Sequence, residues 1–145
     1  MSRAPLLPVA DALVRVLESA RTPLSLEHVP LAECRGRTLA QDVAALRTQP
    51  PFAASAMDGY AVRADDIANV PATLKVIGES AAGRRYAGVV KPGEAVRIFT
   101  GAPVPEGADT ILIQENTKAD GDTVTALESE TLGRYVRRAG LDFSA

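Results

Sequence analysis

The chain has 145 residues, of which 16 are Lys or Arg and 18 are Asp or Glu, for a formal net charge of -2. This length suits one domain with its own core. The basic residues are scattered and form no positive stripe, so neither nucleic acid nor an anionic membrane surface is an expected partner. Asp11 and two prolines interrupt the N-terminal stretch where a signal peptide would be apolar, and no apolar run is long enough to span a membrane. We therefore expect a cytoplasmic protein.

Cysteine and histidine are each present once, as Cys34 and His28. One cysteine allows no intrachain disulfide, which agrees with a reducing compartment. The two counts also exclude a Cys/His zinc site, a Ser-His-Asp triad and a Cys-His pair built from this chain alone. Any catalysis must use carboxylates, hydroxyls, Lys, Arg or backbone groups.

The first 45 residues have mainly helical patterns. Residues 8–20 place apolar side chains at helical spacing, with a proline near the first turn. Pro30 opens a second short helical candidate over 30–34, which Gly36 ends. The pattern resumes over 37–46, with Leu39 and Val43 as its apolar contacts. We predict that residues 1–45 form a helical linker segment.

From residue 46 onward, prolines and glycines divide the chain into short β-branched runs, which predicts a β-rich domain over 46–139. In the run 73–80, Leu74, Val76 and Gly78 are expected on one face. In the run 94–101, Val96 and Ile98 are expected inward and Arg97 outward. Residues 108–127 read as a hairpin with Asp120-Gly121 at its turn. The fold class is therefore α+β, a helical segment followed by short, mostly antiparallel strands.

The stretch SAMDGYAV, residues 55–62, places Asp58 and Gly59 inside an apolar run. Asp-Gly is a common tight-turn pair, so one interpretation makes Asp58 a solvated residue at a hairpin tip. The other makes it a functional carboxylate, because small neighbours would let a ligand approach. Such a carboxylate could contribute to holding Mg²⁺ against substrate phosphates. Both interpretations remain open on these residues alone.

Two further stretches carry candidate chemistry. Thr100-Gly101 ends a strand, and a hydroxyl beside glycine amides can receive an anion, although an ordinary strand-to-loop turn is the common alternative. Three arginines near the C-terminal end could bind phosphates or an acidic partner, namely Arg134, Arg137 and Arg138. Charges of this kind more often form a solvated face.

Taken in order, PPFAASAMDGYAVRADD, RIFTGAPVPEGADTILIQE and YVRRAGLDFSA resemble the amino-terminal part of the molybdenum-insertion enzymes of molybdenum-cofactor synthesis, the MoeA and gephyrin E-domain family. The resemblance covers almost all of the chain. It implies a helical segment and an inserted β-domain with strongly curved sheets. In the family these are followed by an α/β domain and a C-terminal β-domain that this chain does not contain.

The resemblance also implies an activity and an assembly. The family forms elongated homodimers in which the β-domain of one subunit helps to wall a cleft formed with the other. Its reaction takes molybdate and adenylylated molybdopterin, cleaves the adenylyl group in a Mg²⁺-dependent step, and yields molybdenum cofactor and AMP. An adenylyltransferase of the same pathway is a possible partner.

The family's site residues carry over by motif. Asp58 matches the aspartate of Met-Asp-Gly-Tyr-Ala and Thr100 the threonine of Thr-Gly-Ala-Pro, which implies catalytic roles for both. Gly59 and Gly101 in the same motifs, and Arg137 and Asp142 in the Arg-Arg-x-Gly-x-Asp stretch, are the implied substrate-binding residues. The metal ligands are unknown, with Asp58 as a possible contributor.

Two departures from the family accompany these matches. The family often has Asp-Asn where this chain has Ala53-Ala54, which removes two polar groups; we interpret this as tolerated variation. Residues 140–145 are expected to begin the return toward the absent α/β domain, so we expect the 145 residues alone to be inactive. The alternatives are a non-enzymatic scaffold and an independent β-rich binding module.

Overall fold

The computed structural model describes residues 6–20 and 25–145. The chain divides into two compact units, Met1–Val43 and Ala44–Ala145. Each unit is described by itself. The domain boundaries inferred from the sequence stay a prediction.

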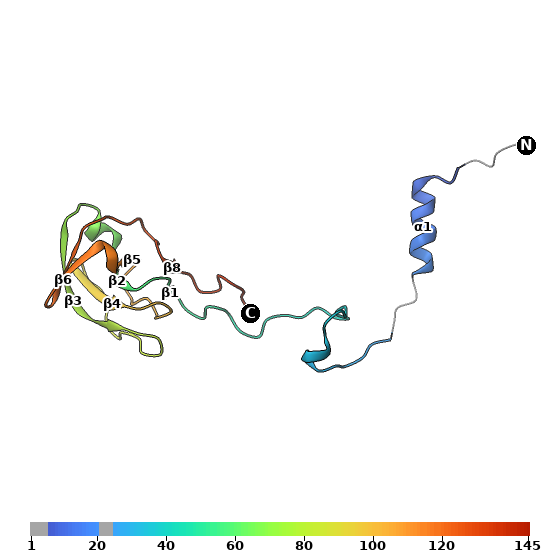
Figure 1. Cartoon of the computed structure of the whole chain (residues 1–145), viewed down its shortest axis with the longest axis horizontal. Helices are drawn as coiled ribbons and strands as arrows, with labels where there is room; N and C mark the ends of the chain where they lie inside the picture. Colours follow the sequence, from blue (N-terminus) through green and yellow to red (C-terminus); the bar gives the residue numbers. More distant parts are fainter. Residues whose placement is uncertain (1–5, 21–24) are drawn as a thin grey trace, which may run out of the picture. The chain divides into compact units, whose positions relative to one another are not determined.

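The first unit contains helix α1, Val9–Ser19, and the 3-10 turn η1, Leu31–Glu33 (Figure 1). The helix predicted over 8–20 is thus present. The prediction that residues 1–45 are mainly helical is wrong for the described part, because residues 37–46 form bends and extended chain. Leu39 and Val43 are 74% and 76% exposed. A short helix needs an apolar surface to pack against, and these side chains have none. None of the helices in the described residues is long and apolar enough to cross a membrane.

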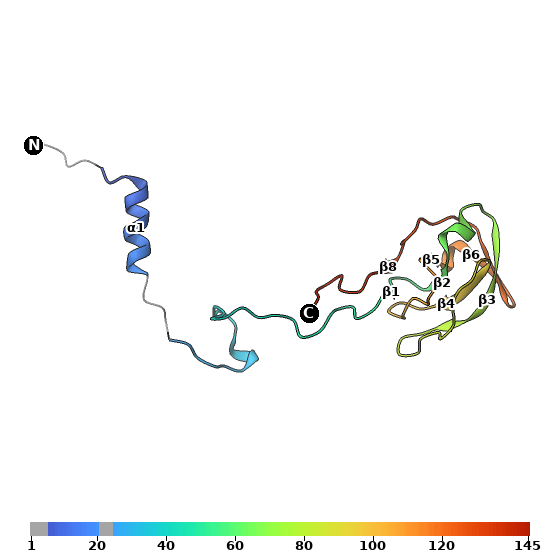
Figure 2. The same ribbon diagram turned by 180° about the vertical axis from the view of Figure 1, so that it is seen from behind.

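The second unit is mostly β and centres on a six-stranded sheet in the order β5-β2-β4-β3-β7-β6. The pair β3 and β4 is parallel, and the other four pairs are antiparallel. Both views show that the sheet is strongly curved (Figures 1 and 2). The strands are β2 Gly59–Val62, β3 Ala72–Ser80, β4 Glu94–Ile98, β5 Thr110–Ile113, β6 Thr117–Asp120 and β7 Thr123–Ala126, and the short turns η2 Ala64–Ile67 and η3 Gln114–Asn116 follow β2 and β5.

The sheet carries one buried cluster on each face. Tyr60, Val62 and Leu112 belong to the first cluster, and Ala61 and Ile111 belong to the second. Because both faces are covered, every residue of β2 is buried. This double burial explains why the run around Gly59 is apolar throughout and does not alternate.

The long strand β3 departs from the expected alternation. Its pairing with β4 shifts register between Val76 and Gly78. Val76 lies opposite Ala95 and packs on the first cluster, whereas Gly78 lies opposite Val96, a member of the second. The prediction of one face for Leu74, Val76 and Gly78 is therefore wrong at Gly78, because a bulge adds one residue and reverses the faces beyond it.

The hairpin predicted over 108–127 is confirmed only for residues 117–126, because residues 110–113 form β5, which pairs with β2. Strands β6 and β7 pair antiparallel, with Asp120 opposite Thr123. Gly121 has φ 59°, a left-handed value that a tight hairpin turn requires and glycine adopts without strain.

A second, two-stranded ladder joins β1, Ala54–Ser55, to β8, Val136–Arg137. The pairing continues beyond these strands. The Gln49 amide donates to the Phe143 carbonyl at 2.8 Å, and the Gly140 amide donates to the Pro50 carbonyl at 2.9 Å. Residues 140–143 therefore run alongside residues 49 and 50, so that Arg137 lies in β8 opposite β1, and Asp142 lies in the segment after β8.

Candidate functional site

Asp58 lies in a bend immediately before β2 and not at a hairpin tip. The strand before it, β1, pairs with β8, whereas β2 pairs with β4 and β5. The hairpin interpretation of Asp58-Gly59 is therefore wrong. The bend is shaped by Ser55, which is 1% exposed and whose hydroxyl donates to the Met57 carbonyl at 2.6 Å. Sequence reasoning did not single out Ser55, although a serine three residues before the aspartate is a turn signal.

The structure brings Asp58 and Thr100 together from positions 42 residues apart. One carboxylate oxygen of Asp58, Oδ1, accepts the backbone amide of Thr100 and also its hydroxyl, each at 2.8 Å. Within residues 25–145, no hydrogen bond involves the other oxygen, Oδ2. The carboxylate is thus anchored on one side and keeps an acceptor for a ligand on the other.

These contacts alter the acidity of the carboxyl group. The hydrogen bond from the Thr100 amide, followed by that from its hydroxyl, lowers the pKa of Asp58 below the usual aspartate range. Partial desolvation opposes this change, and the positive charge of Arg97 adds a smaller lowering. Asp58 is therefore firmly ionised at neutral pH, as a cation ligand or an acceptor must be.

The lowered pKa predicts a pH-dependent stability. A carboxyl group whose pKa is depressed by folding stabilises the folded state above its unfolded pKa, about 3.9, and this stabilisation is lost as the pH falls through the folded pKa. We expect the difference in unfolding free energy between wild type and Asp58→Asn to be constant above about pH 5 and to narrow below it. Urea unfolding at a series of pH values measures this difference. A difference that persists unchanged into strong acid would contradict the assignment.

The amides around Thr100 are already engaged. The Thr100 amide and hydroxyl donate to Asp58, the Gly101 amide donates to the Ser55 carbonyl at 2.8 Å, and the Ala102 amide donates to the Phe99 carbonyl at 2.9 Å. The expectation that glycine exposes free backbone donors here is wrong, because the Gly101 amide donates to a carbonyl of β1 and the Thr100 amide donates to Asp58. A catalytic role for Thr100 and a substrate contact for Gly101 stay predictions.

Gly59 has a packing role that its neighbours impose. A Cβ atom at this position would overlap the carbonyl oxygen of Leu112 and would lie 2.9 Å from the Cα of Ile113. Only glycine lets β2 approach β5 this closely directly after Asp58. Its predicted substrate contact stays a prediction.

Arg97 and Gln114 lie beside Asp58 and were not predicted as site residues. Arg97 was expected to point outward, and it does lie on the face opposite Val96 and Ile98. It is nevertheless half-buried, with its guanidinium over the rings of Tyr60 and Phe99. Strand alternation places Phe99, two residues along the chain, on the same side as Arg97, but no local signal identifies Tyr60, which meets Arg97 only through the pairing of β2 with β4.

Arg137 and Asp142, predicted as substrate-binding residues, form an ion pair. Nη2 of Arg137 contacts both carboxylate oxygens of Asp142, at 3.0 and 2.9 Å. Their side chains are 44% and 41% exposed, so the pair is accessible. Its binding role stays a prediction.

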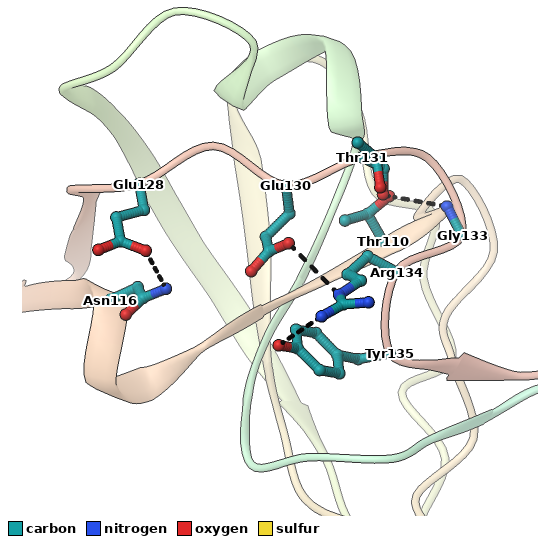
Figure 3. Close-up of polar contacts among 8 residues, drawn as sticks. All are labelled: Thr110, Asn116, Glu128, Glu130, Thr131, Gly133, Arg134 and Tyr135. Atoms are coloured by element: carbon teal, nitrogen blue, oxygen red, sulfur yellow. Dashed lines mark hydrogen bonds and ion pairs between the residues drawn. The ribbon is translucent and has the colours of Figure 1, made fainter.

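Arg134 has different partners in the segment after β7 (Figure 3). Its Nε lies 3.8 Å from the Glu130 carboxylate, and its guanidinium lies over the Tyr135 ring at 4.4 Å from the centroid. The nearby Gly133 amide donates to the Thr110 hydroxyl, and this hydrogen bond joins the segment to β5. These contacts favour a structural role for Arg134 over phosphate binding.

A complete metal site is not found in residues 6–20 and 25–145, since no three acidic, His or Cys side chains gather there. Mg²⁺ commonly uses only one or two protein carboxylates together with water and substrate phosphates. Asp58 fits the role of a single such ligand through Oδ2.

Comparison with protein families gives a match over residues 7–145 to the MoeA N-terminal region (domain I and II). A molybdopterin molybdenumtransferase 2 of Mycobacterium tuberculosis is 42% identical over 121 residues, covering 81% of this chain and 30% of the relative. A molybdopterin molybdenumtransferase of a Nostoc species is 41% identical, covering 88% of this chain and 30% of the relative.

The fold matches as well. The crystal structure of the molybdopterin biosynthesis MoeA protein from Pyrococcus horikoshii OT3 aligns with a TM-score of 0.75 and 37% identity, covering 81% of this chain and 32% of that one. The chain thus spans about a third of the length of the relatives that it matches.

Proposed function

Because the chain belongs to the MoeA family, whose N-terminal region it matches over residues 7–145, we propose that it is the N-terminal part of a molybdopterin molybdenumtransferase. The complete protein would take adenylylated molybdopterin and molybdate and would release AMP and molybdenum cofactor. The relatives' names support the transfer of molybdenum to molybdopterin in this reaction. The observation that carries the proposal at the level of residues is the anchored, half-exposed carboxylate of Asp58.

Asp58 and Thr100 are the proposed catalytic pair. The two donors of Thr100 hold Oδ1 of Asp58 at 2.8 Å, so the carboxylate keeps one position without reorganisation during the reaction. Oδ2 then orients water, molybdate or a hydrated cation at the phosphoanhydride. In this mechanism Thr100 acts chiefly through Asp58, because its own donors are already engaged.

Mg²⁺ is the proposed cation, and when bound it would neutralise charge on the substrate's phosphates. Asp58 would supply one carboxylate. The remaining ligands would come from the substrate, from water and from parts of the protein outside this chain. Arg137 and its partner Asp142 are proposed to bind substrate, with Arg137 contacting an anionic group and Asp142 fixing its orientation. Gly101, where nothing lies within 4 Å of the position of a Cβ, would allow substrate to approach closely beside Thr100. The substrate-binding role proposed for Gly59 is indirect, because the backbone of β5 fills the space beside it and the glycine lets β2 begin directly after Asp58.

A homodimer is the proposed assembly of the complete protein. Its support is the exposed apolar face of α1, where Val9 and Val16 are 85% and 64% exposed. The substrate must come from an adenylyl-transfer reaction, so an adenylyltransferase is a proposed partner. The proposed compartment is the cytoplasm, in keeping with the free thiol of Cys34.

The proposal predicts an activity for the full-length protein that the isolated fragment lacks. Given adenylylated molybdopterin, molybdate and Mg²⁺, we expect the full-length protein to release AMP and molybdenum cofactor, and the 145-residue chain to release neither, because the fragment has one candidate ligand and no further acidic cluster in its described residues. Chromatographic detection of AMP measures this. Full-length protein without molybdate-dependent AMP release would remove the proposed function.

A further inference from the structure

The backbone directly after Asp58 is held by a closed set of contacts. The Gln114 amide donates to the Asp58 carbonyl at 3.1 Å. The Gly59 carbonyl accepts Nη1 of Arg97 at 3.0 Å. The ring is completed where Nη2 of the same guanidinium donates to Oε1 of Gln114 at 2.7 Å. Both peptide groups that follow Asp58 are therefore fixed by two residues that hold each other.

Arg97 also contacts two aromatic rings. It lies opposite Tyr60 in the β2–β4 pairing, with its guanidinium carbon 5.2 Å from the Tyr60 ring centroid and 4.9 Å from that of Phe99. A planar guanidinium that lies over aromatic rings presents its donors in one plane, which a lysine cannot reproduce.

We propose that Arg97 is a positioning residue which, together with Gln114, fixes the Asp58 backbone so that the carboxylate keeps the geometry that Thr100 completes. Thr100, in the turn that follows β4, holds the side chain, and Arg97, on β4 itself, holds the main chain. The strand β4 and the turn after it therefore position both. The inference rests on the proposed function. It adds Arg97 to Asp58 and Thr100 as a third residue of the site.

The test is a double-mutant cycle in the full-length protein, with AMP release as the assay. We expect Arg97→Gln to lower kcat about tenfold while KM changes less than about twofold, because a misplaced carboxylate impairs the chemical step more than binding. In an Asp58→Asn background the same substitution should lower kcat less than about twofold, since the group through which Arg97 acts is already lost. Arg97→Lys should restore only part of the rate.

The matched control is Arg85→Gln, which also removes a positive charge that lies over an aromatic ring, that of Phe52 at 5.6 Å. It should leave kcat unchanged. If Arg97→Gln fails to fold, Gln114→Ala replaces it, because Gln114 is exposed and its loss removes the acceptor of Nη2 without disturbing β4. A loss that is equal in both Asp58 backgrounds, or wild-type kcat in both variants, would overturn the proposal.

A second readout needs no activity. Hydrogen exchange of the Gln114 amide, which donates to the Asp58 carbonyl, should be faster in Arg97→Gln than in wild type, with the global unfolding midpoint little changed. An inactive wild-type protein would remove the proposed function alone. Unchanged exchange at Gln114 would overturn the positioning role of Arg97 even if the enzyme is active.

Discussion

Asp58→Asn in the full-length protein is expected to lower cofactor formation on the order of a hundredfold, the magnitude typical of losing a group that acts directly on the reacting centre. Asparagine keeps the shape of the side chain, and its amide oxygen can still accept both donors of Thr100. It loses the negative charge, and its second position becomes an amide nitrogen that cannot bind a cation. Folding and dimerisation should be retained. Initial rates of AMP release measure the effect.

The control for this substitution is Asp122→Asn, which makes the same chemical change at an exposed position after the β6 strand. Its turnover should equal that of wild type. Turnover of Asp58→Asn within about twofold of wild type would remove Asp58 from the catalytic pair. A parallel loss in both variants would indicate an effect of overall charge instead.

Gly59→Ala is expected to destabilise the sheet by about 3 kcal/mol, at the upper end of the range for overpacking. The added methyl group would overlap the backbone of Leu112 and Ile113, which cannot move without separating β2 from β5. Hydrogen exchange of the amides in these two strands measures the loss of stability. Because Asp58 directly precedes this pairing, we expect the activity to fall together with the protection of the β2 and β5 amides against hydrogen exchange.

Gly83→Ala provides the comparison, since Gly83 also lies in the β-domain and nothing lies within 4 Å of the position that a Cβ would take. Its φ of 80° makes alanine unfavourable by about 1 to 2 kcal/mol, but only within its own turn. Amides of β2 and β5 should then exchange as in wild type. Normal protection of β2 and β5 in Gly59→Ala would show that the sheet accommodates the methyl group.

Local sequence signals identified the elements that depend on neighbouring residues. The spacing of apolar residues placed the helix that is observed as Val9–Ser19. Turn chemistry placed the hairpin whose glycine has φ 59°. The motifs around Asp58 and Thr100 pointed to the family that the comparison over residues 7–145 confirms. These features are local, so a short stretch of sequence carries enough information to identify them.

The sequence predictions that are wrong concern segments whose structure is decided by packing. Residues 37–46 have a helical pattern but no surface to pack on, and so they form no helix in this chain. Gly78 changed face because of a bulge that only the pairing of β3 with β4 reveals. The apparent hairpin at Asp58-Gly59 failed because β2 finds its partners far along the chain.

The sequence by itself determined the family, the β-rich character of the chain after residue 46 and the residue types available for chemistry. Tertiary structure alone decided that both donors of Thr100 bind Asp58, and that Arg97 contacts the Tyr60 ring and donates to the Gly59 carbonyl. The reason is that the contacts of Arg97 with the Gly59 carbonyl and of Thr100 with Asp58 join residues 38 and 42 positions apart, and that the contact of Arg97 with Tyr60 depends on the register between β2 and β4. Strand register and the burial of both sheet faces are set by the packing of the whole domain, which no short motif encodes.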